Sequence, residues 1–596
     1  MKEFCQRTTG WCLTILFFLL PLKFGTIAAM PEQPPMFPTD LLTLGIISWP
    51  PHCAGIAGAL LLGASVLLFP APRWRTPGGL TALFWGILLP VAALPGIIGG
   101  SNSDYVFATV AHWFGIGAFI LSAWWIFSAS PGWKKAALHA LAAGVLCAGI
   151  EGWRQYIWGF DEMQEMIRKQ REAGIEISEI MEIRIMDSRV FSTLGSCNTF
   201  AGFLLLTIPA VLALVQDWAK RFEPVKLSRI LFSLAAGVLL LPPFFMTRSR
   251  GAWLCAFLIG AIFFFSRKRI KKLYKGIFLA VCILLLGGGV FLMHRSGRGL
   301  LSGAERLDYL RTSFIICSEH PFKGAGWGEF FHRHMKIKLS KSDESARSPH
   351  NLPAFFAVHA GIPAGLIALG ALAVLLFELF RNSGDDPVFR WGRWGVAAFV
   401  LHCFMEINDV IPASMICCAA GTLALLPEET TGREEKNTLP SLIKWSASGA
   451  AVLVGIAGFY TNFHWVRSEA AFEKLELCLR PRNVQGPMTA PEPARVMALL
   501  DDVCRLRPRS PYPLEMAGDY FFYSGDTENA RKLYSRSLEL VPYRPAVHRR
   551  LALIACRTND RELAKKHLAA ARALFPADPR NQEKRFFDDY ERSLRK

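Results

Sequence analysis

Two arginine residues stand in the short turn Thr247-Arg248-Ser249-Arg250-Gly251, between two apolar stretches, and Arg189 precedes another apolar stretch. A planar guanidinium group forms paired, charge-assisted hydrogen bonds with phosphate oxygens, and each such contact contributes about 1.5–3 kcal/mol. Arg189, Arg248 and Arg250 therefore predict a site for a phosphate or pyrophosphate group. The alternatives are contact with anionic lipid headgroups, or pairing with acidic residues of the segment 161–187.

A histidine that could accept a proton occurs in Ser348-Pro349-His350-Asn351, at the start of a further apolar stretch. Serine followed by proline is typical of a helix start, with Ser348 as the N-cap. His350 would then lie in the first helical turn, where the positive helix end favours the neutral ring. A lone histidine is usually structural, so it is the arginines that favour catalysis here. His359, nine residues on, is expected to face away.

Carboxylates occur in the turn Glu406-Ile407-Asn408-Asp409 after another apolar stretch. A carboxylate at this place could orient a histidine or an acceptor hydroxyl, or it could be a solvated turn residue. The segment with Glu305, Arg306 and Arg311 belongs to a loop that could close over such a site.

The composition excludes several other kinds of site. Of 596 residues, 52% are hydrophobic, and the formal net charge of +18 comes from basic residues clustered in loops beside the apolar stretches. That placement is typical of topology signals in a membrane protein, and no nucleic-acid motif accompanies it. The 14 cysteines are scattered without metal-ligand spacing. We therefore expect no metal, no cofactor and no nucleic-acid partner.

The elements that must position these residues are membrane-spanning helices, since a span needs about 20 mostly apolar residues. The sequence predicts an all-α transmembrane bundle over residues 1–465. The first apolar stretch resembles a signal peptide and is interpreted as an uncleaved span. The predicted spans, about 13 in number, are 11–29, 53–70, 80–98, 105–128, 136–157, 195–215, 228–246, 250–266, 276–293, 351–379, 393–407, 411–426 and 444–463.

Positive charge alternates between the loops, as the positive-inside rule requires. With a cytoplasmic N-terminus, six inside loops hold 20 lysine and arginine residues, whereas the short outside loops 99–104 and 408–410 hold none. This orientation places the four candidate segments on the outer face. Two outside loops, 158–194 and 294–349, are long, and an amphipathic helix along the membrane surface is expected within 161–187.

The tail, residues 466–596, is predicted to lie outside. Pro508, Pro542 and Pro576 are spaced 34 residues apart, which is typical of tetratricopeptide repeats. Two repeats are clear, and a third, around 478–511, is degraded. Such a domain binds a peptide or a protein partner, or it only stabilises the membrane part.

Several motifs together resemble the bacterial O-antigen ligase and O-antigen polymerase family. The resemblance covers about residues 180–425. It rests on Arg189 to Asn198, on Ser249-Arg250-Gly251, on Glu319-His-Pro-Phe-Lys-Gly-Ala-Gly-Trp-Gly328, and on His350-Asn351 followed by His359-Ala-Gly-Ile-Pro-Ala-Gly365.

This resemblance implies a metal-independent GT-C-type glycosyltransferase in the bacterial inner membrane. Such enzymes take a glycan from undecaprenyl pyrophosphate on the periplasmic face. By motif, Arg189 and Arg250 would hold the pyrophosphate, with Arg248 in the same turn, and His350 would be the general base. Asp409 is a looser match. The acceptor would be a glycan, a lipid or a protein.

Two other classes remain open from the sequence. A transporter or flippase of lipid-linked or anionic solutes should show two similar halves meeting at the midplane, and no such halves are evident. A membrane-anchored scaffold that uses the repeats would leave Arg250 and His350 without a role.

Overall fold

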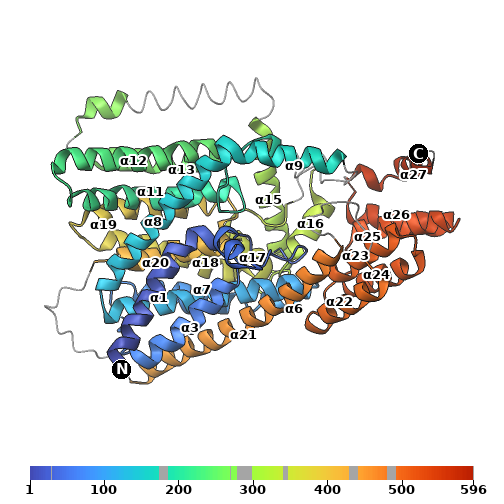
Figure 1. Ribbon diagram of the computed structural model, residues 1–596, viewed down its shortest axis with the longest axis horizontal. Coiled ribbons are helices and arrows are strands. Elements are labelled where there is room, and N and C mark those ends of the chain that lie inside the picture. The colour runs from blue at the N-terminus through green and yellow to red at the C-terminus, as the bar shows by residue number, and fades with distance from the viewer. Residues whose placement is uncertain are drawn as a thin grey trace.

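The computed structural model describes residues 1–28, 30–74, 76–172, 185–268, 270–277, 299–339, 346–427, 441–479, 491–576 and 578–594. Over these residues the protein is helical and has no β-strand, which confirms the predicted fold class. Figure 1 shows long, roughly aligned helices that form one bundle, and a group of shorter C-terminal helices at one end of it.

The helices of the bundle and its loops are α1 (Lys2–Lys23), α2 (Leu41–Ile46), α3 (Cys53–Leu68), α4 (Gly79–Thr81), η1 (Ala82–Leu88), α5 (Leu89–Ala92), α6 (Gly96–Gly99), α7 (Ser103–Ala129), α8 (Gly132–Arg154), η2 (Gln155–Gly159), α9 (Phe160–Glu172), α11 (Cys197–Ala219), α12 (Val225–Met246), α13 (Arg250–Ser266), α15 (Gly299–Glu319), α16 (Glu329–Ile337), α17 (Leu352–Ala360), α18 (Ile362–Arg381), α19 (Pro387–His402), η3 (Asn408–Val410), α20 (Pro412–Leu425) and α21 (Ser441–Leu479).

Each predicted span except the ninth has a helical counterpart, and most of the ninth, 276–293, lies outside the described residues. In the described part, six helical runs are long and apolar enough to cross a membrane, and three shorter apolar helices accompany them. The tenth span differs from the prediction, because Gly361, with a φ of 97°, separates α17 from α18. The protein is thus a multi-pass membrane protein, and its total number of spans stays a prediction.

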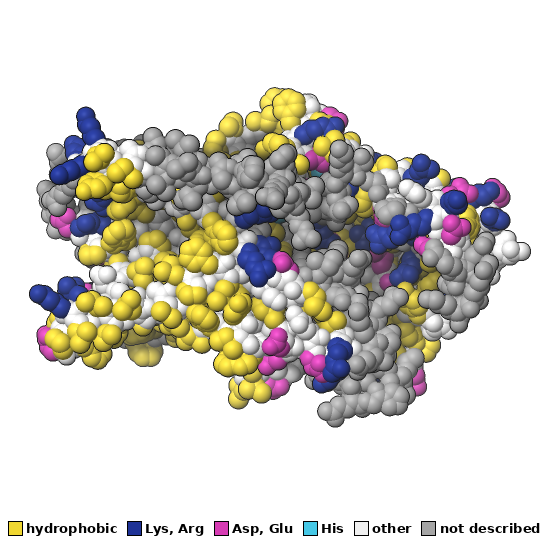
Figure 2. Space-filling view, turned by 90° about the horizontal axis from the view of Figure 1, so that it is seen from above, with side chains coloured by type: hydrophobic (Ala, Val, Ile, Leu, Met, Phe, Trp, Pro, Cys, Tyr) yellow, Lys and Arg dark blue, Asp and Glu magenta, His cyan; other side chains and the backbone are white. Residues whose placement is uncertain are grey.

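The surface agrees with this assignment. Figure 2 shows hydrophobic side chains over a broad band of the bundle, with lysine and arginine side chains gathered at its end and near the C-terminal helices. Large apolar residues on the outside of α3, α12, α18 and α21 are more than half exposed, as lipid-facing residues are: Leu67, Leu234, Leu366 and Ile456.

The helix α7 forms the centre of the bundle, and most of its residues are buried. Small residues let its neighbours approach closely, since a Cβ atom at Gly58 of α3 would lie 2.7 Å from Phe119 of α7. The side chain of Asn462 in α21 donates a hydrogen bond to the Ala111 carbonyl at 2.7 Å. These contacts hold α3, α7 and α21 together as one packed unit.

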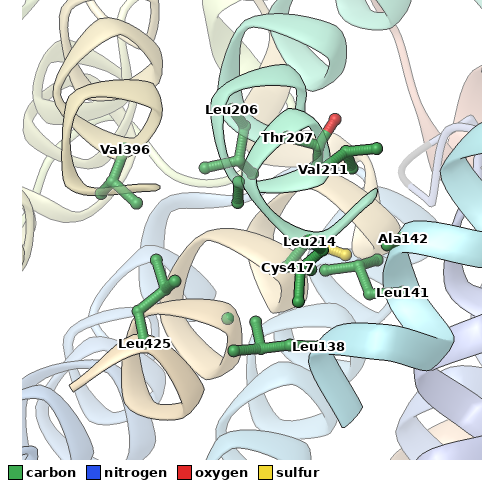
Figure 3. Close-up of a pocket in the computed structure, with 12 residues that line it drawn as sticks. Leu138, Leu141, Ala142, Leu206, Thr207, Val211, Leu214, Val396, Cys417 and Leu425 are labelled. Atoms are coloured by element: carbon green, nitrogen blue, oxygen red, sulfur yellow. The ribbon is translucent and has the colours of Figure 1, made fainter. Parts of the chain in front are cut away.

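A small apolar cavity of about 30 Å³ lies among α8, α11, α19 and α20 (Figure 3). Leu138, Leu206, Val396 and Leu425 border it, and the hydroxyl of Thr207 bonds the Phe203 carbonyl of its own helix at 2.8 Å. With aliphatic walls and no free polar group at Thr207, this cavity is a packing gap and not a site for chemistry.

The C-terminal helices are α22 (Pro493–Leu506), α23 (Tyr512–Tyr523), α24 (Thr527–Leu540), α25 (Pro545–Arg557), α26 (Arg561–Leu574), η4 (Pro579–Asn581) and α27 (Glu583–Leu594). The hairpins α23–α24 and α25–α26 recur with an offset of 34 residues, as the start of α24 at Thr527 and of α26 at Arg561 shows. Part of the third predicted repeat lies outside the described residues. The tetratricopeptide assignment stays a prediction.

This hairpin domain is joined firmly to the bundle. The guanidinium of Arg507 lies 3.8 Å from the ring centre of Trp465 and 4.0 Å from the carboxylate of Asp104, and all three side chains are buried. The helix α21 is continuous across residue 465, where the sequence placed the domain boundary. On the other side, Lys336 of α16 lies over Tyr543, so a loop of the membrane part also contacts the hairpins.

Candidate functional site

A buried carboxylate, Glu406, lies at the centre of a polar network at one end of the bundle. Its side chain is 2% exposed and accepts hydrogen bonds from Asn198 at 3.1 Å and from Arg306. The Nδ1 atom of His350 lies 3.4 Å from the second carboxylate oxygen. Glu406 thus connects the start of α11, the long α15 and the segment before α17.

Arg189 extends this network to the arginine turn. Its Nε donates to the Thr247 carbonyl at 2.9 Å, and one terminal nitrogen donates to the Asn198 side chain at 2.9 Å. Asn198 itself is placed by the start of α11, where its N–H bonds the Ser196 hydroxyl at 3.3 Å. Hydrogen bonds therefore run without a break from the Arg248 turn through Arg189 and Asn198 to Glu406.

The two arginines of the turn differ in their surroundings. Arg248 has a φ of 51° and donates to the backbone and side chain of Asp187, at 3.2 and 3.4 Å. Arg250 is the first residue of α13 and is exposed, and it makes no hydrogen bond or ion pair with any described residue. Since a helix start also presents unpaired N–H groups, Arg250 is the better placed of the two to meet an anion.

His350 does not lie in the first turn of a helix, as the sequence predicted. The helix α17 begins at Leu352, and its N-cap is Asn351, whose side chain accepts from the Ala354 N–H at 2.9 Å. The Ser348 hydroxyl instead accepts a hydrogen bond from the His350 N–H at 3.3 Å. His350 therefore lies before the helix start, and its ring faces the Glu406 carboxylate.

The imidazole of His350 is held from two sides. It stacks on Tyr309 of α15, with ring centres 5.4 Å apart and an angle of 23°, while Glu406 faces its Nδ1 atom. His359, as expected, faces elsewhere: it is buried against Trp327 and bonds the Phe355 carbonyl at 2.8 Å. Tyr309 was not singled out in the sequence, because only the fold brings α15 to His350.

Backbone conformations with positive φ recur in the site. Apart from glycine, such residues are uncommon, and those that occur are enriched at functional sites. Of the five in the described part, Arg248 and His350 are candidates themselves, and Ser188 and Ser192 flank Arg189. Contacts with Asp187 hold Arg248 against that backbone strain, and contacts with Glu406 and Tyr309 hold His350.

Asp409, the carboxylate favoured by sequence, lies deeper than Glu406. It is fully buried in η3, and neither of its carboxylate oxygens has a hydrogen-bond partner among the described residues. Burial raises the pKa of Asp409 to about 7. The 3₁₀ turn directs Asp409 inward, and its carbonyl accepts from His112 at 2.7 Å. The structure therefore brings Glu406, and not Asp409, into hydrogen-bond contact with His350.

The substitution Asp409→Asn tests whether Asp409 is a buried carboxyl group that stays neutral in the folded protein. A carboxyl group whose pKa is about 7 in the folded chain and 3.8 when free makes the fold less stable as pH rises from about 4 to about 7, and the loss levels off above pH 7. We therefore expect the melting temperature of Asp409→Asn, measured relative to that of the wild type, to increase as pH rises from 5 to 8. Thermal unfolding of both proteins in the same detergent measures this. A melting difference that is independent of pH would contradict the buried, neutral carboxyl.

The glycine-rich segment before α16 has a structural role at the edge of the site. Gly326 has a φ of 99°, and a Cβ atom there would lie 2.1 Å from the Gly100 nitrogen. Next to it, Trp327 is fully buried and donates to the Ala93 carbonyl at 2.8 Å. The segment therefore fixes α16 and its loop against α6 and does not contact His350.

Comparisons with known proteins give two matches. Residues 235–369 match the family model described as O-antigen ligase, a range that contains Arg248, Arg250, Arg306 and His350. The chain is also 25% identical, over 251 residues, to the ComP-specific O-oligosaccharyltransferase of Acinetobacter baylyi. That match covers 39% of this chain and 44% of the relative's length. Together with the helical bundle, these matches show that the region 235–369 is similar to O-antigen ligases and support a relationship of the chain to that family.

Proposed function

We propose that this protein transfers or polymerises a glycan from undecaprenyl pyrophosphate onto an acceptor hydroxyl at the periplasmic face of the bacterial inner membrane. The observation that carries the proposal is the network from Arg189 through Asn198 and Glu406 to His350. Arg250, which has no partner in the described part of the chain, stands two residues after Arg248 in the adjoining turn. Such a cluster would supply cations for a diphosphate next to a proton acceptor for a hydroxyl.

His350 acts as the general base in this proposal. Because Glu406 faces Nδ1, the carboxylate favours the tautomer that carries its proton there, and Nε2 is left as the acceptor. The acceptor oxygen attacks the anomeric carbon, its proton passes to Nε2, and the bond from that carbon to the pyrophosphate oxygen breaks. Glu406 then stabilises the imidazolium that forms.

The leaving pyrophosphate takes the electron pair of the broken bond, so its negative charge grows as the reaction proceeds. Arg250 and the N-terminus of α13, with Arg248 and Arg189 nearby, supply fixed positive charge at that point. Attack from the face opposite the leaving group inverts the anomeric configuration. Since these residues provide both roles, we expect activity to persist in the presence of a metal chelator.

The test is a reaction in vitro with the purified full-length chain, an undecaprenyl-pyrophosphate glycan and separate acceptors. The acceptors are a second lipid-linked glycan, lipid A core, and a pilin-type protein. Product formation with any of them supports transfer, and the productive acceptor decides between polymerase and ligase. No product with all three, together with movement of labelled lipid-linked glycan across vesicles, would establish the transporter alternative instead.

The protein acceptor has one specific observation in its favour. The relative from Acinetobacter baylyi is by name an O-oligosaccharyltransferase specific for ComP. The C-terminal hairpins offer a surface for a partner next to α16, which lies in the loop before His350. We propose that these hairpins, residues 466–596 with the end of α21, form a periplasmic tetratricopeptide-like domain that serves a protein or glycan partner.

The proposed orientation can be tested without an activity assay. Positions 250 and 350 should both react with a membrane-impermeant thiol reagent from the periplasmic side, after the native cysteines are replaced and single cysteines are introduced. A single cysteine at a position predicted to be cytoplasmic, such as 135, should not react with the same reagent in intact cells. Labelling of positions 250 and 350 from opposite sides would contradict the site as well as the topology.

Glu406→Gln should lower the transfer rate about 10–100-fold, since a charge-assisted interaction with His350 is lost. The amide keeps the size of the side chain and can still contact Asn198, so the fold should be retained. Initial rates at saturating donor measure the effect, and Glu329→Gln, at a carboxylate that bonds Ser101 outside the network, is the matched control. Equal rates for Glu406→Gln and the wild type would remove Glu406 from the mechanism.

A further inference from the structure

Arginine and aromatic side chains gather where α13 ends and α19 begins, at the end of both helices away from Arg250 and His402. The guanidinium of Arg267 lies 4.3 Å from the ring centre of Phe263. That of Arg393 lies within 6.0 Å of the ring centres of Phe380, Phe389 and Trp394. Aromatic and basic residues in such proximity are typical of the lipid headgroup region.

Within the residues that the structure describes, this cluster has positive charge without a matching negative charge. Arg267 and Arg390 lie close enough to Arg393 for their like charges to interact. Among the described residues, no carboxylate forms an ion pair with any of the three. The nearby acids serve other contacts, since Asp386 caps α19 and Glu378 accepts from the Gly78 N–H at 2.9 Å. Three neighbouring cations that have no counter-charge in the described part of the chain favour the binding of an anion from outside.

An apolar crevice of about 270 Å³ begins at the same aromatic residues. Phe263, Trp391 and Trp394 form its end nearest the arginines, and it continues between α11, α12, α13 and α19. Small residues and a proline leave it open, and a Cβ atom at Gly260 would meet no other atom within 4 Å. The remaining lining residues are Leu204, Leu205, Ile208, Pro209, Leu241, Phe244, Ala256, Ile259, Gly395 and Ala398.

We propose that the arginine cluster and the crevice together bind an anionic phospholipid. The phosphate is held by Arg267, Arg390 and Arg393, and one acyl chain enters the crevice past Trp391 and Trp394. An apolar groove directly beside unpaired cations suits a molecule with both parts, whereas a free phosphate would leave the crevice empty. Basic pockets between membrane helices recognise anionic lipids by this combination. The site is distinct from the proposed glycan-transfer site.

Native mass spectrometry of the delipidated, full-length protein tests the proposal by titration with three lipids. These are dioleoyl phosphatidylglycerol, dioleoyl phosphatidylcholine, and the water-soluble dihexanoyl phosphatidylglycerol. We expect the first to bind tightest, because the second lacks net charge and the third lacks a long chain. Removing each arginine charge should weaken the binding of phosphatidylglycerol about fivefold. The double variant Arg267→Gln with Arg393→Gln should therefore weaken its binding about 25-fold.

Two variants test the crevice and the cluster separately. Gly260→Leu should fill the crevice without a clash. It should weaken the binding of both long-chain lipids by the same factor, so the preference for phosphatidylglycerol should be retained. The matched controls are Gly63→Leu, at an exposed and equally open glycine of α3, and Arg73→Gln, at an exposed arginine in the loop after α3. Neither control should change lipid binding, and melting temperatures in detergent identify any variant that does not fold.

Wild-type affinity for phosphatidylglycerol in the folded double arginine variant would overturn the headgroup site. Unchanged binding of both long-chain lipids in Gly260→Leu would overturn the acyl-chain site. Displacement of phosphatidylglycerol by an equimolar amount of undecaprenyl phosphate would overturn the assignment to a phospholipid. The crevice would then be a binding site for the polyprenyl carrier.

Discussion

His350→Ala should lower the rate of glycan transfer by about 10²–10⁴-fold, the usual contribution of general base catalysis. The loss should fall on kcat, because His350 is proposed to act on the acceptor proton and not to bind the donor. Initial rates over a range of donor concentrations, with the reconstituted full-length protein, separate kcat from KM.

The matched control for this experiment is His320→Ala. His320 lies in the same outer loop, but its ring contacts Arg333 at 2.8 Å and has no contact with Glu406. Its removal should leave the transfer rate close to that of the wild type. If His350→Ala is folded and transfers glycan at an unchanged rate, the imidazole is not the base, whatever the acceptor.

Arg250→Ala should weaken transfer about 10- to 150-fold, the effect of losing about 1.5–3 kcal/mol of contact with a phosphate group. Because Arg250 has no partner among the described residues, its removal should cost little stability. The reduction should appear in kcat/KM for the lipid-linked donor, with a melting temperature near that of the wild type.

Arg248→Ala serves as the comparison within the same turn. Its guanidinium already pairs with Asp187 and is more than half exposed, so we expect a smaller reduction than for Arg250→Ala. Arg250→Lys should recover part of the activity, since an amine keeps the charge but loses the planar fork. Equal effects of Arg248→Ala and Arg250→Ala would show that the turn acts through net charge alone.

The sequence was sufficient to place Arg189, Arg250 and His350 on the same end of the bundle. Each stands at the boundary of an apolar stretch, and the alternation of positive charge orients those boundaries without knowledge of the packing. The helical fold follows from the same stretches, because in lipid the backbone must satisfy its own hydrogen bonds. The residues that this reasoning found are therefore those whose position depends on local sequence.

The parts that sequence could not give depend on tertiary contacts. Glu406 and Asp409 share one turn and are chemically equivalent in the sequence, yet Glu406 meets Asn198 and Arg306 whereas Asp409 points into the core. The stacking of Tyr309 on His350 joins segments 41 residues apart. Even the helix start was displaced, because Asn351 both caps α17 and bonds the Phe404 carbonyl at 3.2 Å. A serine–proline pair contains no information about that second contact.

The buried contact of Arg507 with Asp104 and Trp465 has a consequence for whatever the hairpins recruit. Since α22 cannot swing away from α7 and α21 without exposing that charge, the C-terminal helices keep one orientation relative to the helical bundle. A protein or glycan bound to the hairpins, as proposed above, would therefore be held at a fixed distance from His350.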